Sequence, residues 1–457
     1  MAIIPQTQLF NWDDVEAKSD LTRFQYVLDC LPDEPLMRTL EEARGRGRDD
    51  YPVRAVWNAI LAGVVFGHPT IESLRRELLR NAELRQVCGF DVILGADAVP
   101  KPWNFSRFLA NLFRCQAEVE AMFHRLVTRL KRELPDLGGA LSADSKAIAS
   151  AGKPKDREAK RDGRREKDAD WGKKTYRETD EAGNTWEKVK VWFGFKLHLI
   201  VDARYELPLA YEVTKASVND GACLLPMVEE LEEHHPEIVR DADHLSADKA
   251  YDSRRILETL QDRYGILPLI DTRNDWKDGD ATRPLFPDRA DCIVYDVQGT
   301  VYCDRGRADL AATESPMSFG GYEADRGTLK YLCPAARENS VCPRAESGGC
   351  RYGRIVRVKL DTDRRYFVPL PRSTHKWSRL YAKRTAVERV NSRLDVSFGF
   401  ERHTIRGIAK MRCRTGLALA VMLAMALGAI RENRRDRMRS LVWSGARAKT
   451  AEEIRAA

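Results

Sequence analysis

The sequence predicts an α/β fold with a helical region at the N-terminal end and a cysteine-rich insertion before the last helices. Three patterns lead to this prediction: helical apolar spacing up to about residue 134, short apolar runs alternating with helical segments from residue 137, and an interruption rich in Pro, Gly, Arg and Cys after residue 271. The 457 residues suffice for about three domains. The expected divisions are a helical region (1–136), the first part of an α/β core (137–270), the insertion (271–372), the C-terminal helices of the core (373–430) and a basic tail (431–457).

The composition indicates a globular protein with a small excess of positive charge. Lys and Arg number 76 against 69 Asp and Glu, giving a formal net charge of +7, which suits an extended anionic partner without establishing one. Met1–Pro5 has no cationic stretch followed by a long apolar one, so we expect no secretory signal and a cytoplasmic protein. The longest apolar run, Leu417–Ile430, is shorter than the ~20 residues that span a bilayer and predicts a buried helix.

The N-terminal region is expected to be helical from Leu21 to about Leu134. In residues 70–80, Thr70 is a candidate N-cap, followed by leucines on one side of the helix and arginines on the other. That basic face suits either contact with DNA or simple exposure to solvent, and the sequence leaves both interpretations open.

Strands are expected to follow from residue 138. A short apolar run ends at Asp144, and residues 153–174 are so densely charged that we expect a loop or linker, either solvated or tracking DNA. Residues 192–201 and 209–213 predict a hairpin, with Asp202 at its turn and His198 as an ordinary strand histidine rather than a metal ligand.

Further helices and strands alternate along the rest of the core. Helices are expected over 222–233, over 254–264 with Gly265 as the stop, and over 378–396, and short strands over 244–248 and 266–270. This alternation favours a sheet with helices packed on it.

Three acidic residues stand out for their positions. Asp144 and Asp248 are each expected at the end of an apolar strand, where ligands gather in α/β sheets, and Glu388 lies in a predicted helix. Neighbouring carboxylates repel unless a cation neutralises them, and oxygen ligands suit Mg²⁺ or Mn²⁺. Three such groups are enough to hold two metal ions about 4 Å apart, the arrangement that supports in-line displacement at phosphorus in nucleases and strand-transfer enzymes.

The segment around Glu388 resembles a family signature. Tyr381, Arg384 and Glu388, with two and then three residues between them, resemble the Tyr-Arg-Glu-Lys signature of bacterial insertion-sequence DDE transposases, although Asp395 stands where the family has Lys. Other segments follow the same family order along nearly the whole chain. They are Asp144-Ser-Lys, Gly194-Phe-Lys-Leu-His, Lys215-Ala-Ser-Val-Asn-Asp220 and Ala247-Asp-Lys-Ala-Tyr-Asp252.

The resemblance implies an RNase H-like catalytic domain with a metal-binding catalytic triad. By that resemblance Asp144, Asp248 and Glu388 bind Mg²⁺ or Mn²⁺, and the N-terminal helices serve DNA binding or assembly. The expected DNA-binding residues are Tyr381, Arg384, Arg389, Arg393 and Lys249. Arg389 and Arg393 are the candidates to replace the missing signature Lys. Tyr381, Arg384 and Glu388 are spaced to share one helix face. The implied partners are double-stranded DNA, as element ends and target, and further copies of the chain in a homodimer or larger assembly on DNA.

Ten cysteines divide into two groups. Cys303, Cys333, Cys342 and Cys350 lie in the insertion, and four thiolates can bind one Zn²⁺ and staple a segment that lacks its own core. Their spacing contains no Cys-x-x-Cys, so free thiols remain the alternative, although related transposases carry similar inserts. The others are expected in the core, except Cys292, which lies near the first group; the core set is Cys30, Cys88, Cys115, Cys223 and Cys413.

The leading functional hypothesis is a DNA transposase that binds the terminal inverted repeats of its element, cleaves by two-metal hydrolysis and joins the 3′-OH ends to target DNA. Two alternatives remain at this point. One is a transposase-derived DNA-binding protein without catalysis, consistent with Asp395 in the signature. The other is a metal-dependent nuclease that hydrolyses DNA without joining it.

Overall fold

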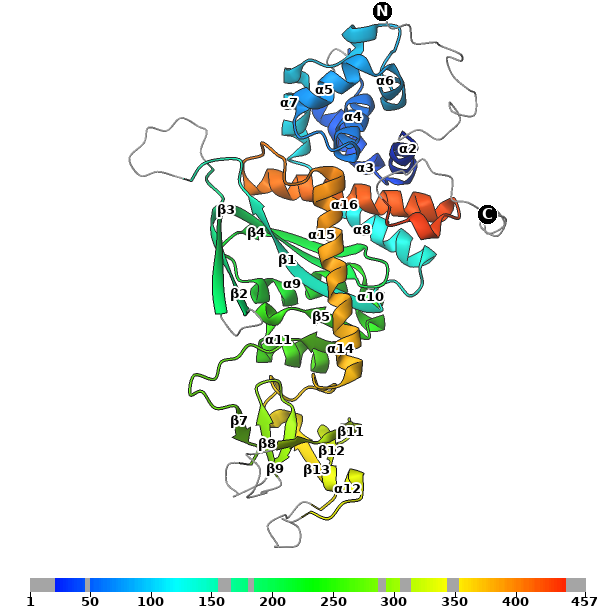
Figure 1. The fold of residues 1–457 in the computed structure, drawn as a ribbon. Coiled ribbons are helices and arrows are strands. Elements are labelled where there is room, and N and C mark those ends of the chain that lie inside the picture. Colours follow the sequence, from blue (N-terminus) through cyan, green and yellow to red (C-terminus); the bar gives the residue numbers. More distant parts are fainter. Residues whose placement is uncertain are drawn as a thin grey trace, which may run out of the picture.

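The computed structural model describes residues 21–45, 50–154, 166–179, 185–286, 293–304, 314–342 and 353–440. Within these residues the chain has a helical end, a central sheet covered by helices, and two small sheets at the opposite end (Figure 1). Helices and strands therefore mix as the sequence predicted.

Helices make up the N-terminal end, as expected. They are α2 (Leu21–Cys30), α3 (Glu34–Arg44), α4 (Val53–Val65), α5 (Ile71–Arg80), α6 (Ala82–Cys88), α7 (Pro102–Leu112) and α8 (Gln116–Glu133), with the 3-10 turn η1 (Gly95–Ala98). Thr70 caps α5, because its hydroxyl accepts from the Ser73 amide at 3.1 Å while the Ser73 hydroxyl lies within hydrogen-bonding distance of the Thr70 amide. Leu74 and Leu78 are then buried in the core, and Arg75 beside them donates to the Pro100 carbonyl.

The central sheet has the strand order β2-β3-β1-β5-β6, and β4 also pairs with β3. Its strands are β1 (Ala140–Ala149), β2 (Asp170–Thr179), β3 (Thr185–Asp202), β4 (Pro208–Lys215), β5 (His244–Ala247) and β6 (Leu267–Ile270). β1 runs parallel to β5, and β5 to β6, whereas β2, β3 and β4 form antiparallel pairs and β3 lies antiparallel to β1. The predicted hairpin is β3 and β4, with Asp202 accepting from the amides of Arg204 and Tyr205 at its turn.

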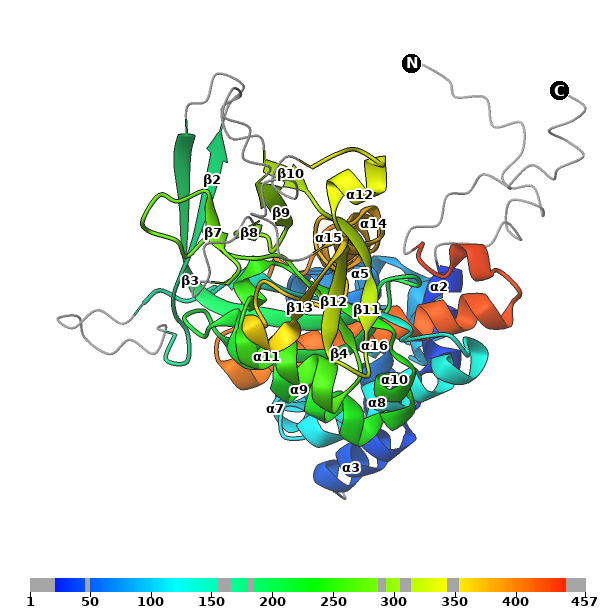
Figure 2. The ribbon, with the colours of Figure 1, turned by 90° about the horizontal axis from the view of Figure 1, so that it is seen from below.

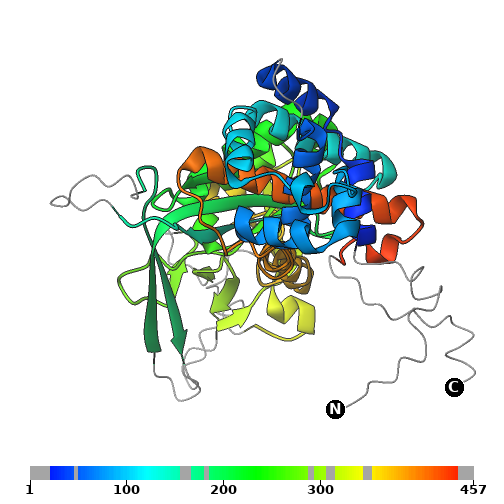
Figure 3. The ribbon, with the colours of Figure 1, turned by 90° about the horizontal axis from the view of Figure 1, so that it is seen from above.

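The loop expected over residues 153–174 is wrong at its end, because β2 begins at Asp170. β2 and the first half of β3 form a two-stranded ribbon that extends away from the sheet (Figures 2 and 3). Trp171 on this ribbon is 57% exposed, so even a large apolar side chain is not buried here. Strands without a buried face need no alternation of apolar and polar residues, and the sequence pattern therefore does not reveal them. Residues 155–165 of the expected loop lie outside the described residues.

Gly194 marks the point where the ribbon leaves the sheet. It pairs with Asp170 of β2 and with Ala149 of β1. A Cβ at this position would lie 2.1 Å from the Ile148 carbonyl oxygen, so only glycine fits between the strands.

Helices cover both faces of the sheet, with α15 on one side and α9 on the other (Figure 2). These helices and turns are α9 (Asp220–His234), α10 (Pro236–Asp241), η2 (Lys249–Tyr251), α11 (Arg254–Glu258), the π-turn η3 (Thr259–Arg263), α14 (His375–Tyr381), η5 (Ala382–Arg384), α15 (Thr385–Phe398), α16 (Ile408–Arg431) and η6 (Arg435–Arg437). The single helix expected over 378–396 is wrong, since η5 divides it. The break leaves the Arg384 carbonyl to accept a hydrogen bond from the Ser142 hydroxyl of β1 at 2.9 Å.

α16 is the central helix of the molecule. By length and composition it could cross a membrane, but 89% of its most apolar window is buried, against α8, α2 and β4. The buried helix expected over Leu417–Ile430 is confirmed.

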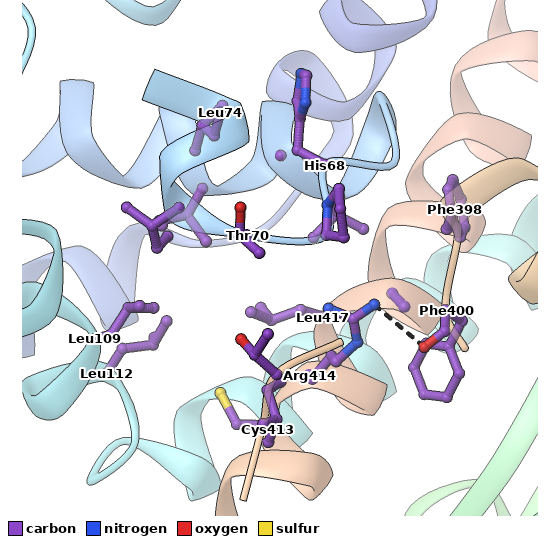
Figure 4. A pocket seen from close by; sticks show the side chains of 18 of the residues that line it. His68, Thr70, Leu74, Leu109, Leu112, Phe398, Phe400, Cys413, Arg414 and Leu417 are labelled. Carbon is purple, nitrogen blue, oxygen red and sulfur yellow. Dashed lines mark hydrogen bonds between the residues drawn. The ribbon is translucent and has the colours of Figure 1, made fainter. Parts of the chain in front are cut away.

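A small apolar pocket of about 180 Å³ lies where the N-terminal helices meet α16 (Figure 4). Leu74, Leu109 and Leu417 line it from three helices. Arg414 at its edge donates to the carbonyl oxygens of Gly399 and Phe400, which follow the end of α15. The pocket is therefore a packing seam in which a cationic side chain caps a helix end.

The described part of residues 271–372, the expected insertion, has an apolar core of its own, contrary to expectation. Its elements are β7 (Thr282–Pro284), β8 (Ile293–Asp296), β9 (Val301–Asp304), β10 (Glu314–Pro316), β11 (Ser318–Glu323), β12 (Thr328–Leu332), α12 (Pro334–Glu338), β13 (Ile355–Lys359) and η4 (Leu360–Thr362). Val301, Leu329 and Phe367 are buried together between its two small sheets. Short strands of three to six residues carry too little periodicity to announce such a core in the sequence.

Candidate active site

Two carboxylates lie at adjacent positions on neighbouring parallel strands. The pairing of β1 with β5 aligns Ala143 with Ala247, so Asp144 and Asp248 are the next residues of the two strands. Asp248 follows the end of β5 as predicted and accepts from the Ala250 amide at 2.8 Å. The prediction that Asp144 ends its strand is wrong, because β1 continues beyond it while pairing with β3.

Asp144 is held in a strongly perturbed environment. Its side chain is only 13% exposed. Burial and the negative charge of Asp248 raise its pKa to about 6, against weaker opposing effects of Lys174, the Ser145 amide and Arg384. A carboxyl group that is costly to ionise beside a second carboxylate favours binding of a cation.

Glu388 reaches the same region from α15 through Arg384. The Arg384 guanidinium lies 2.8 Å from the Glu388 carboxylate and 3.8 Å from that of Asp144. It also lies 5.8 Å from the centre of the Tyr381 ring, which stacks on Trp377 at 4.4 Å. Tyr381, Arg384 and Glu388 thus share one side of the helical segment as predicted, although η5 interrupts it.

These carboxylates open into a groove of about 1240 Å³ between the β2–β3 ribbon and α15. Eight basic side chains line it: Lys146, Lys173, Lys174, Lys190, Lys196, Lys249, Arg273 and Arg384. Lys249 and Arg384 were predicted as DNA-binding residues, and the other six were missed. For Lys196 the sequence did offer a signal, because Lys196 and Asp220 each lie in a segment that follows the family order. The structure joins their side chains in an ion pair of 2.8 Å in the groove.

Arg389 and Arg393 do not line this groove. Both bind Glu206 in the turn between β3 and β4, at 2.6 Å and 3.4 Å. The Arg393 side chain is 12% exposed, and burial lowers its pKa to about 10. In this structure the two arginines brace α15 against the sheet rather than facing the carboxylates.

Asp395 does line the groove and has a cationic partner from another element. Lys146 of β1 forms an ion pair with Asp395 and a second one, at 3.0 Å, with Glu401. At the position where the family signature has Lys, this chain therefore has a carboxylate paired with a lysine from the opposite wall.

The cysteines of the insertion are only partly described. Cys303 is buried in β9, Cys333 precedes α12 and packs against the same small core, and Cys342 is partly buried. Cys350 and Cys292 lie outside the described residues. Zinc binding by Cys303, Cys333, Cys342 and Cys350 therefore stays a prediction.

The remaining cysteines and His198 match their predicted roles. Cys30, Cys88, Cys115, Cys223 and Cys413 are buried. His198 is 1% exposed on β3, and its Nε2 lies 2.9 Å from the Thr214 hydroxyl. Burial lowers its pKa to about 4, so it is a neutral strand histidine at pH 7.

The donor set suits a hard divalent cation. Asp144 and Asp248 offer carboxylate oxygens from adjacent strands, and Glu388 offers a third that is 51% exposed. Among the described residues the three carboxylates do not form one compact group of donor atoms, because Arg384 stands between Glu388 and Asp144. The pair Asp144 and Asp248 is thus the fixed part of the site.

Comparison with known families decides the class of protein. The family described as Transposase DDE domain matches residues 143–424, which is more than half of the chain. The chain belongs to this family. Residues 12–111 also match the Transposase domain (DUF772) family, which covers most of the N-terminal helices. No curated protein matches the chain.

The protein is therefore a transposase of the insertion-sequence type. Membership of the transposase DDE domain family implies an enzyme that binds DNA, cleaves it and transfers strands, and the family generally uses divalent metal ions. The matched region contains Asp144, Asp248 and Glu388. The assignment of the Tyr-Arg-Glu-Lys signature to Tyr381, Arg384 and Glu388 stays a prediction.

Proposed function

We propose that this transposase binds the terminal inverted repeats of its own element, cleaves DNA there and joins the freed 3′-OH ends to target DNA. The observation that carries the proposal is the juxtaposition of Asp144 and Asp248 in a groove lined by eight basic side chains, with Glu388 linked to it through Arg384. Carboxylates grouped beside a larger number of cationic side chains suit a phosphodiester better than a neutral substrate.

We further propose that residues 137–270 and 373–430 form one RNase H-like catalytic core. Four strands joined in antiparallel pairs, β1 to β4, followed by the two short parallel strands β5 and β6, with helices on both faces, support this assignment. In this division residues 1–136 serve DNA binding or assembly, 271–372 form an insertion and 431–457 a basic tail.

In this proposal Asp144, Asp248 and Glu388 hold Mg²⁺ or Mn²⁺. When bound, the metal supplies Lewis-acid activation of the attacking oxygen and stabilisation of the leaving oxygen. Arg384 and Lys249 lie beside these carboxylates and neutralise the phosphate that the groove receives. The elevated pKa of Asp144 supports the fit, since a cation at this place relieves the cost of its charge.

The β2–β3 ribbon extends the DNA-binding surface in this proposal. It presents Lys173 and Lys190 to the groove together with the exposed ring of Trp171. Lysines contact phosphates without regard to sequence, and an exposed aromatic ring stacks on an unpaired base. We therefore expect DNA affinity to fall steeply with salt, with each lysine contact adding about one unit to the slope of log K against log salt.

The decisive test is a cleavage and joining assay with Mg²⁺ or Mn²⁺ on DNA that carries the natural flanks of the gene. We expect Asp144→Ala, Asp248→Asn and Glu388→Gln each to abolish cleavage while DNA binding persists. Asp325→Asn, in the exposed turn between β11 and β12, is the matched control and keeps full activity. Cleavage retained in a triad variant removes that residue from the proposed site.

The same assay separates the alternative functions. Cleavage without joined products identifies a hydrolytic nuclease, and binding without any wild-type chemistry identifies a non-catalytic DNA-binding derivative. Mass measurement of the complex with end DNA tests the proposed dimer or larger assembly, which a single bound chain contradicts.

A further inference from the structure

A second group of metal-binding side chains lies outside the groove, where α8 meets α9. His124 comes from α8, and Glu230 and His234 come from successive turns of α9. One donor atom of each side chain lies within 4.8 Å of the other two. His124 Nε2 is 3.6 Å from the Glu230 carboxylate, and the rings of His124 and His234 stack at 3.8 Å.

A fourth residue fixes the orientation of the His124 ring. Nδ1 of His124 lies 3.1 Å from Nε2 of His235, which is buried. This contact engages Nδ1 of His124 and leaves its Nε2, on the side of the Glu230 carboxylate, as the nitrogen available to a metal ion. Metal-binding histidines are held in this way by a partner on the other ring nitrogen.

The surrounding charge also favours a cation. Burial, and then the negative charges of Glu230 and Glu212, raise the pKa of Glu120, one turn before His124 on α8. Arg412 is the nearby cation, and it is paired with Glu212 at 2.6 Å. Carboxylates therefore crowd this junction, and a divalent ion there lowers their mutual repulsion.

We propose that His124, Glu230 and His234 bind a zinc ion that links α8 to α9. Two imidazoles and one carboxylate are a donor set that zinc favours, and water completes a tetrahedron. The residues on α9 are four apart, so they face the same side of the helix. The ion joins a helix of the N-terminal region to a helix that packs on the central sheet, so its role is to hold these two parts together.

The test is zinc titration of full-length, tag-free protein after metal removal. We expect Glu230→Gln and His234→Ala to lose one equivalent of bound zinc and the accompanying rise in melting temperature. The control, His375→Ala, removes an exposed histidine from α14 and keeps both. His234 is exposed, so its replacement leaves the fold of the metal-free protein unchanged.

Cobalt substitution distinguishes this site from the cysteines of the insertion. A cobalt spectrum without thiolate charge-transfer bands, lost in His234→Ala, supports the proposal. Unchanged zinc stoichiometry and unchanged zinc-induced stabilisation in His234→Ala and Glu230→Gln would overturn it. This outcome is independent of DNA cleavage, because none of the three ligands lines the groove.

Discussion

Replacing Asp144 with Asn is expected to stabilise the protein while abolishing catalysis. The carboxyl group is 13% exposed, and its pKa is about 6 in the folded chain against an ordinary value of 3.8. At about 1.4 kcal/mol for each pH unit, this difference corresponds to a cost of about 3 kcal/mol for ionising Asp144 in the folded state at pH 7. The value already includes the attraction of Lys174 and Arg384. Asn has nearly the same shape and removes the charge, so most of this cost should disappear.

The sign of the pH dependence follows from the raised pKa. The folded state binds the proton of Asp144 more tightly than the unfolded state, so the cost is complete above about pH 7 and vanishes as the pH falls toward 3.8. At pH 5 roughly half of it remains. Other carboxyl groups, such as those of Asp136 and Glu323, have lowered pKa values in the folded protein. Their contribution to the stability of the folded state is lost as the pH falls. Only the difference between wild type and Asp144→Asn isolates this one group.

Urea unfolding followed by circular dichroism, with a chelator present, measures this difference at pH 7 and pH 5. We expect Asp144→Asn to be more stable by up to about 3 kcal/mol at pH 7, and by about half as much at pH 5. Asp325→Asn should match the wild type at both pH values, and added Mg²⁺ should stabilise the wild type and Asp325→Asn but not Asp144→Asn. An Asp144→Asn protein that is less stable at pH 7, or a stability difference that does not shrink at pH 5, would refute the reasoning.

Three other substitutions test separate parts of the structure. Asp395→Lys places two ammonium groups together at Lys146 and should cost about 2–3 kcal/mol of unfolding free energy. The Lys146→Glu/Asp395→Lys double variant should recover only part of this, because Glu401 lies 3.0 Å from Lys146, and equal urea midpoints in all three proteins would contradict the prediction. Asp252→Asn breaks the 2.6 Å pair between a fully buried carboxylate and Arg365 of the insertion and should cost about 3 kcal/mol, with faster hydrogen exchange in residues 353–370 as the readout. Trp171→Ala should weaken binding to single-stranded DNA by about 1–3 kcal/mol without lowering the melting temperature, and unchanged affinity in a fluorescence titration would count against the ribbon.

The sequence predicted best those elements whose periodicity one buried face imposes. α8 and α9 have helical apolar stripes, and β5 is a short apolar run, and all three appear where expected. β2 was missed because both faces of the ribbon are open to solvent, so nothing forces its residues to alternate. The break at η5 is accompanied by a hydrogen bond between Ser142 and Arg384, which are 242 positions apart, so no local pattern encodes this contact.

The candidate site divides in the same way. Asp144 and Asp248 could be singled out because each was expected at the end of an apolar strand, where ligands gather in α/β sheets, although β1 continues beyond Asp144. The pair of Lys146 and Asp395 could not, since 249 positions separate the two residues.

The helical geometry of α15 places Arg389 and Arg393 on a different face from Glu388. At about 100° per residue, Arg389 lies about 100° and Arg393 about 140° from Glu388 around the helix, whereas Asp395 lies within about 20° of it. The structure agrees, because Asp395 lines the groove with Glu388 and the two arginines bind Glu206 instead. Asp395, at the position of the signature Lys, therefore lies on the groove face, whereas the proposal that Arg389 and Arg393 take over the role of that Lys stays a prediction.

Arg384 reduces the repulsion between carboxylates of the site in the absence of a metal ion. Its guanidinium is 2.8 Å from Glu388 and 3.8 Å from Asp144, so one charge offsets part of the repulsion of two. Asp248 is stabilised separately by capping η2. The remaining cost of ionisation then falls mainly on Asp144, the more buried of the two carboxylates beside Arg384, and the pKa of Asp144 rises. Asp144→Asn is therefore the substitution that should most clearly separate stability from catalysis. A cation that binds Asp144 and Glu388 together must compete with Arg384, and a displaced guanidinium remains beside the groove to pair with phosphate.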